Sequence, residues 1–138
     1  MGVVIDTSAF VALERRGAEL SESLASSVGS DEVFVPALVL AELWIGVEMA
    51  ESATRRASRV RKIEALLAGT TTLAFDERVA PTYARLWAAL RRLGTPIPAN
   101  DLAIASLAIH FGLGILVGPD DEAHFRRIPQ LSVHVLAS

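Results

Sequence analysis

The chain has 138 residues, no cysteine and a formal net charge of -3 at pH 7, with 51% hydrophobic and 21% charged residues. This length predicts a single domain over residues 1–138, and no apolar run reaches the roughly 18 residues that a membrane helix needs. The absence of cysteine excludes disulfides and thiolate metal sites, while the acidic balance argues against a protein that coats nucleic acid through net positive charge. The start of the chain lacks a basic segment, which predicts no signal peptide and favours a soluble, cytoplasmic protein.

The hydrophobic pattern alternates between short runs typical of buried strands and longer stretches with helical spacing. The predicted elements, in chain order, are strand 3–6, helices 9–15 and 19–28, strand 33–35, helices 37–49 and 53–67, strand 71–75, helices 77–93 and 101–111, and strands 115–117 and 132–136. Ser8 and Asp76 are the predicted N-caps of their helices. Strands separated by helices predict an α/β fold with a mainly parallel central sheet that helices cover on both faces.

Four acidic residues stand at the end of a strand or on a helix, each in apolar sequence. They are Asp6 after the first strand, Glu42 on the central helix, Asp101 in the first turn of a later helix, and Asp120 after the fourth strand. A carboxylate among core-forming residues is costly unless a cation or a donor compensates it. In parallel sheets, ligands bind beyond the carboxyl ends of the strands, where Asp6 and Asp120 fall. The pattern predicts a carboxylate cage for a hard divalent ion, Mg²⁺ or alternatively Mn²⁺.

Three segments resemble one known family. The opening Val3-Val4-Ile5-Asp6-Thr7-Ser8, the helix start Asn100-Asp101-Leu102-Ala103 and an aspartate after the next strand resemble the PIN-domain ribonucleases. Their order, their spacing and the chain length resemble most closely the VapC toxins of bacterial toxin–antitoxin pairs. The resemblance covers essentially the whole chain and implies a three-layer α/β/α PIN-like domain. It also implies a Mg²⁺- or Mn²⁺-dependent endoribonuclease that cuts RNA with a metal-activated water, a VapB-type antitoxin as partner, and a homodimer.

The resemblance and the chemistry together give each acid a role. Asp6, Asp101 and Asp120 are expected to hold the metal, and Glu42 to bind a second ion or to orient the attacking water. Supporting roles are expected for neighbouring polar residues, namely Thr7, Ser8, Asn100 and Asp121. Asn100 and the two hydroxyls are alternatively helix caps only.

The loop after the fourth strand is crowded with acids. Counting from the strand selects Asp120, whereas counting back from Phe125 selects Asp121 or Glu122. We expect Asp120 to face the site, because it directly follows the strand, and the other two acids to be solvated. The loop also departs from the family, because Gly118 stands where a hydroxyl residue is common.

Two other classes of function remain open at this stage. Another metal-dependent phosphohydrolase would use the same carboxylates, and a catalytically inactive PIN-like module would keep the fold and bind RNA or protein without cleaving. The basic residues of segment 55–62 favour a solvated helix face over a phosphate-binding surface.

Overall fold

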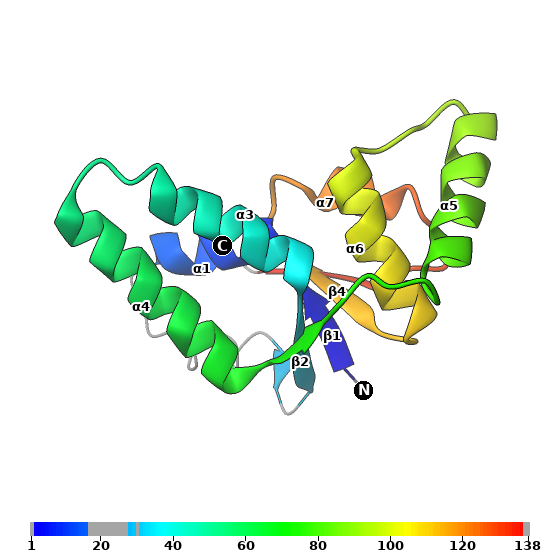
Figure 1. The fold of residues 1–138 in the computed structure, drawn as a ribbon. Helices are drawn as coiled ribbons and strands as arrows, with labels where there is room; N and C mark the ends of the chain where they lie inside the picture. Colours follow the sequence, from blue (N-terminus) through cyan, green and yellow to red (C-terminus); the bar gives the residue numbers. More distant parts are fainter. Residues whose placement is uncertain (1, 17–27, 30, 137–138) are drawn as a thin grey trace.

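The structure is a computed structural model that describes residues 2–16, 28–29 and 31–136. Its elements, in order, are β1 (Gly2–Ile5), α1 (Thr7–Arg15), β2 (Glu32–Pro36), α3 (Ala37–Glu48), α4 (Ala53–Gly69), β3 (Thr71–Leu73), α5 (Ala80–Arg92), α6 (Ala99–His110), β4 (Gly114–Val117), α7 (Glu122–Arg126) and β5 (Val133–Val135), shown in Figure 1. The helix predicted over 19–28 falls almost entirely outside the described residues. No described helix is both long and apolar enough to cross a membrane.

The five strands form one sheet in the order β3-β2-β1-β4-β5, and every neighbouring pair is parallel. All residues of β1 and β4 are buried, as expected for central strands that have helices on both faces. The parallel arrangement brings the carboxyl ends of β1 and β4 to the same edge of the sheet. The prediction of an α/β fold with a parallel sheet is confirmed.

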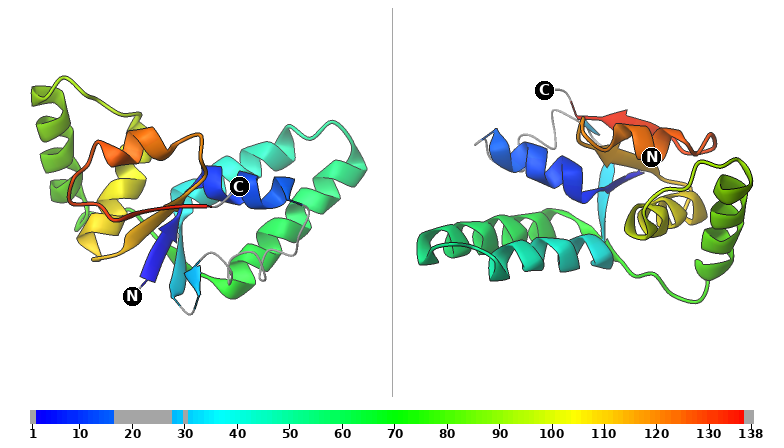
Figure 2. Two further views of the ribbon diagram at one scale, coloured as in Figure 1. Left: turned by 180° about the vertical axis from the view of Figure 1, so that it is seen from behind. Right: turned by 90° about the horizontal axis from the view of Figure 1, so that it is seen from above.

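The helices form two groups beside the central strands. In Figures 1 and 2, α1 lies with α3 and α4 on one side, whereas α5, α6 and α7 lie on the other. The two groups touch where α3 packs against α6. The core between helices and sheet is apolar, and its largest fully buried side chains include Ile5, Leu13, Ile63, Leu66, Leu102, Ile104, Ile115, Leu116 and Phe125.

Some predicted boundaries are wrong, each for a local reason. Asp6 caps α1 in place of Ser8, since its side chain accepts the Ser8 backbone N–H at 3.0 Å. Asp76 does not cap α5, which begins at Ala80; its carboxylate accepts the Arg78 N–H within a preceding turn. The short helix α7 was not predicted, because five residues are too few to show helical periodicity.

Gly118 makes the closest contact between the end of β4 and the start of α1. Its N–H donates to Ser8 Oγ at 3.0 Å. A Cβ at this position would lie 2.6 Å from the carbonyl oxygen of Ser8, a separation that real Cβ atoms essentially never show. Glycine therefore allows the loop backbone to reach α1 in this chain.

We predict that Gly118→Ala destabilises the fold. The methyl group would push β4 and α1 apart, and overpacking of this kind costs roughly 1–3 kcal/mol. Gly69→Ala is the matched control, because a Cβ there meets nothing within 4 Å, and its effect should be neutral or stabilising. Chemical denaturation measures both variants, and equal free energies of unfolding would contradict the close-contact argument.

Candidate active site

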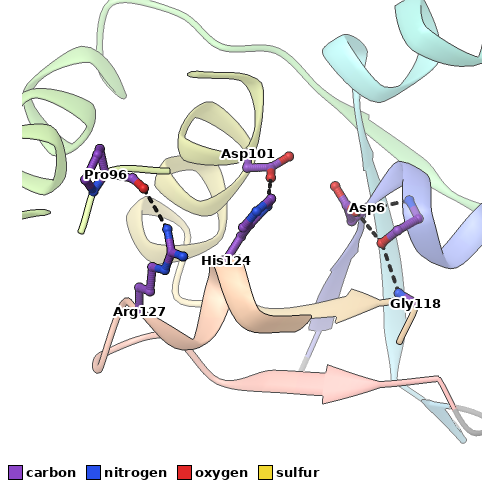
Figure 3. Close-up of polar contacts among 7 residues, drawn as sticks. Asp6, Pro96, Asp101, Gly118, His124 and Arg127 are labelled. Atoms are coloured by element: carbon purple, nitrogen blue, oxygen red, sulfur yellow. Dashed lines mark hydrogen bonds and ion pairs between the residues drawn. The ribbon is translucent and has the colours of Figure 1, made fainter. Parts of the chain in front are cut away.

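Asp6 lies at the carboxyl end of the central strand and is only 2% exposed. One oxygen of its carboxylate accepts two hydrogen bonds from Ser8, one from the backbone N–H and one from the hydroxyl. Because the same hydroxyl accepts from Gly118 N–H, a continuous chain of hydrogen bonds links β4 to Asp6 (Figure 3). Burial raises the pKa of Asp6, the Ser8 bonds partly lower it, and the charges of Asp101 and Asp121 raise it further.

Glu42 projects from α3 toward the same place. Burial is the main cause of its raised pKa; a contact with Thr7 lowers the pKa, and the charges of Asp6, Asp101 and Asp121 raise it. The Thr7 hydroxyl is buried and makes no hydrogen bond of normal geometry within the described part of the chain. Thr7 therefore lies close enough to Glu42 to lower the pKa of its carboxyl group.

Asp101 stands in the first turn of α6, as predicted, with its side chain 16% exposed. Its Oδ2 lies 2.7 Å from Nδ1 of His124 on α7 (Figure 3). Burial raises the pKa of Asp101, the hydrogen bond from His124 lowers it, and the charge of Asp121 raises it. The contact with His124 was not foreseen from the sequence, because α7 itself was not predicted.

Asp121, and not Asp120, interacts with the other acids. The charge of Asp121 raises the pKa of Asp6, Glu42 and Asp101, whereas Asp120 contributes to none of these shifts. Asp120 is exposed and Asp121 is partly buried, so the expectation of a solvated Asp121 is wrong. The chain turns after β4, where Asp121 N–H lies 3.4 Å from the Gly118 carbonyl oxygen, so the direction of the strand does not carry on to Asp120 and Asp121.

Two other predicted neighbours of the site point elsewhere. The carboxylate of Glu122 pairs with Arg126 at 2.8 Å on the surface of α7, as expected for a solvated acid. Asn100 is exposed, and α6 begins without a side-chain cap, so Asn100 does not cap its helix. Most basic side chains of α4 form ion pairs. Arg55 pairs with Glu51, Arg56 with Glu48 and Lys62 with Glu14, as expected for a solvated helix face.

The donor set at this edge fits a hard divalent ion in its chemistry. The acids supply only oxygen ligands, and their mutual repulsion together with burial raises three of their pKa values, a penalty that a bound cation would relieve. In the described part of the chain, however, no group of three histidine or acidic side chains is placed closely enough to hold a metal ion. A ligand shell would therefore require the side chains to turn inward.

Two hollows adjoin the acids. One, of about 500 Å³, is lined by α1, by Glu42 and by the loop from Gly118 to Asp121. The other, of about 330 Å³, shares Thr7, Val11, Arg15 and Glu42 with the first but extends between α1, α3 and α4 over apolar side chains, including Phe10, Leu43 and Ile63. Glu42 lines both hollows, and Asp120 and Asp121 line the larger one.

Comparisons with known proteins point to one family. The PIN domain family model matches residues 3–131. The chain is 32% identical to a ribonuclease VapC of Rickettsia bellii, covering 96% of this chain and 95% of the relative, and 37% identical to ribonuclease VapC5 of Mycobacterium tuberculosis, covering 87% and 84%.

Solved structures show the same fold. VapBC-5 of Mycobacterium tuberculosis superposes with a TM-score of 0.75 at 30% identity, covering 99% of this chain and 98% of the other. VapBC2 of Rickettsia felis, bound to a DNA fragment from its promoter, superposes with a TM-score of 0.84 at 23% identity and covers 99% and 100%. The chain therefore belongs to the PIN-domain family and, within it, to the VapC ribonucleases.

Proposed function

We propose that this chain is the toxin of a toxin–antitoxin pair and cleaves RNA internally, with Mg²⁺ or Mn²⁺ held by Asp6, Asp101 and Asp121. The observation that carries the proposal is the electrostatic coupling of acids from separate segments at one edge of the sheet. Such coupling at a cleft is typical of functional sites. Asp121 takes the place that the sequence suggested for Asp120. The resemblance to VapC ribonucleases supports a cytoplasmic setting, where RNA and an antitoxin would meet.

Each residue at the site has a separate proposed role. A divalent ion would neutralise charge on the scissile phosphate and lower the pKa of a water molecule. Asp6 holds one carboxylate oxygen in the Ser8 bonds and leaves the other for the ion. Glu42, whose raised pKa suits a proton acceptor, would orient the attacking water together with the neighbouring Thr7 hydroxyl. His124 fixes the carboxylate of Asp101 by holding Oδ2.

The alternatives have less support. Ser8, the hydroxyl nearest the acids, is engaged by both Asp6 and Gly118, which does not suit the covalent nucleophile of a phosphatase. An inactive binding module would have no use for one buried and three partly buried carboxylates that repel one another. The retained acids therefore favour an active nuclease over a module that only binds.

The smaller hollow beside Glu42, which is lined by both apolar and charged side chains, suits a VapB-type antitoxin. Relatives of this fold were solved as VapBC complexes, and one is 30% identical to this chain. An amphipathic segment could place apolar side chains against Phe10, Leu43 and Ile63 and a basic one near Glu42, where it would displace the metal. Ile45 on α3 and Met49 directly after it are 61% and 74% exposed, so they add apolar surface beyond the hollow.

A homodimer is proposed through the surface around α5. Trp87 and Leu93 are 48% and 70% exposed there, an unusual exposure for large apolar side chains. The hollow under Trp87 holds only about 30 Å³, too little for a peptide segment, so this surface suits a flat contact with a second copy. The antitoxin and the second copy would thus use different faces.

We predict that Asp101→Asn abolishes cleavage. The change keeps the size of the side chain but removes a metal-binding charge, so cleavage of RNA should fall at least about 10²-fold while the fold survives. Asp76→Asn is the matched control, because Asp76 lies in an exposed turn and pairs only with Arg78. Cleavage assays with added Mg²⁺ or with EDTA measure the effect, and undiminished cleavage in EDTA would refute the metal-dependent mechanism.

The fourth acid is tested by comparing two adjacent variants. Asp121→Asn should weaken Mn²⁺ binding about tenfold or more, which corresponds to about 1.4 kcal/mol. Asp120→Asn should be nearly silent, because its side chain is exposed and affects none of the other acids. Calorimetry on both variants decides the matter, and the reverse order of effects would restore Asp120 as the ligand.

The two partner surfaces should separate by mutation. Leu93→Asp should shift the chain from dimer to monomer in light scattering without weakening antitoxin binding. Ile45→Asp should do the opposite, weakening the complex with the VapB-type protein encoded by the neighbouring gene while the dimer persists. If the unmodified chain is monomeric, the dimer proposal is wrong; if Ile45→Asp binds the antitoxin normally, the α3 surface is not the docking face.

A further inference from the structure

The larger hollow continues from the acids along the whole of α1. It is lined by Thr7, Ser8, Val11, Ala12, Arg15, Arg16, Glu42, Gly118, Pro119, Asp120, Asp121 and Leu136. The α1 residues in this set recur every three or four positions, so they form one stripe of the helix. The opposite face of α1, with Ala9, Phe10 and Leu13, is buried in the core. One wall of the hollow is therefore a single helix face that begins at the active site.

Charge changes along this wall from one end to the other. Ser8, bonded to Asp6, stands at the acidic end, and Arg15 and Arg16 stand at the other. Arg15 is seven residues after Ser8. At a rise of 1.5 Å per residue, the two lie about 10 Å apart along the helix axis. A flexible arginine side chain at that distance reaches a point next to the acids without touching them.

The charges of the two arginines are not used within the described structure. Both side chains are exposed, and neither forms an ion pair or a hydrogen bond with a side chain that the structure describes. They also do not affect the pKa of Asp6, Glu42 or Asp101. The arginines of α4 differ, because Arg55 and Arg56 pair with glutamates and Arg59 donates to the Gly46 carbonyl.

A purely structural role explains only part of the placement of Arg15 and Arg16. Arg15 lies in the last turn of α1, where a cation interacts favourably with the helix dipole. That role requires no cavity and no second arginine. The lining of a hollow that ends at the acidic cluster gives both guanidinium groups a ligand-facing position.

We propose that Arg15 and Arg16 bind backbone phosphates of the RNA next to the scissile phosphate. This inference rests on the proposed nuclease function. A guanidinium group presents paired N–H donors that match two phosphate oxygens. Between the two ends, Val11, Ala12 and Leu136 offer an apolar floor for the sugar. No aromatic residue lines the described hollow, so this subsite holds the backbone and does not select bases by stacking.

Salt dependence of RNA binding tests the inference directly. Each phosphate contact with a single strand contributes about 0.7 to the slope of log affinity against log salt. In an Asp101→Asn background, in EDTA and with a mixed-sequence single-stranded RNA, the added changes Arg15→Gln and Arg16→Gln should weaken binding. Together they should reduce the slope by about 1.4, the sum for two contacts.

Matched variants separate phosphate binding from helix stability. Arg92→Gln also removes an exposed arginine from the last turn of a helix, α5, but away from the hollow, and should leave the slope unchanged. Arg15→Lys keeps the charge and loses the paired donors, so it should retain the slope while lowering affinity. Circular dichroism shows whether each variant is folded. If Arg15→Gln does not fold, the RNA affinity of Arg15→Lys provides the test.

The outcomes distinguish this inference from the proposed function. If the unmodified chain cleaves RNA but the double arginine variant binds with the slope of Arg92→Gln, the phosphate subsite is refuted and the nuclease stands. If the double variant loses antitoxin binding and keeps RNA binding, the arginines serve a protein partner and the inference is also refuted. If the unmodified chain neither cleaves nor binds RNA, the proposed function fails first.

Discussion

The active site depends on the bonding of one buried carboxylate. Asp6 ends the central strand, caps α1 through Ser8 N–H and receives the Ser8 hydroxyl, which in turn is held by Gly118 beyond β4. Removing a carboxylate from water costs several kcal/mol, while each hydrogen bond to a charged group returns about 1.5–3 kcal/mol. These bonds offset only part of the cost, because the pKa of Asp6 stays raised. The hydrogen bonds that join β1, α1 and β4 thus also hold the Asp6 carboxylate in a position where a bound cation would stabilise it.

The raised pKa values of Asp6, Glu42 and Asp101 share a consequence for stability. A carboxyl group whose pKa is higher in the folded state favours folding at low pH, and this contribution is lost as the pH rises through the folded-state pKa. At neutral pH the metal-free acids therefore oppose folding. A cation that binds only the folded chain acts in the opposite direction. The repulsion among the acids lowers the stability of the metal-free protein and raises the affinity for a divalent ion. A cost in stability of this kind is common at functional sites.

The sequence predicted the features that follow from hydrophobic pattern, and it failed where a turn decides the direction of a side chain. Buried runs such as Val3–Ile5 and Ile115–Val117 predicted central parallel strands, and the acids that follow or flank core elements predicted the edge where Asp6, Glu42 and Asp101 meet. The choice between Asp120 and Asp121 could not be made from the sequence, because alternation along a strand does not continue through the turn at Gly118. The contact between His124 and Asp101 joins residues 23 positions apart through a helix too short to predict. That Arg15 and Arg16 form no ion pair among the described residues likewise required the structure, since Arg55 and Arg56 on α4 look the same in sequence and are paired.

The most direct test of this account is the position of a bound ion. Crystals of the chain soaked in Mn²⁺ and measured for anomalous scattering would show where the metal lies. We expect one strong peak at the carboxyl edge of β1, with Asp6, Asp101 and Asp121 turned toward it and Asp120 still in solvent. A peak coordinated by Asp120 without Asp121, or no peak near Asp6 at saturating Mn²⁺, would contradict the assignment of this acidic edge as the metal site of the nuclease.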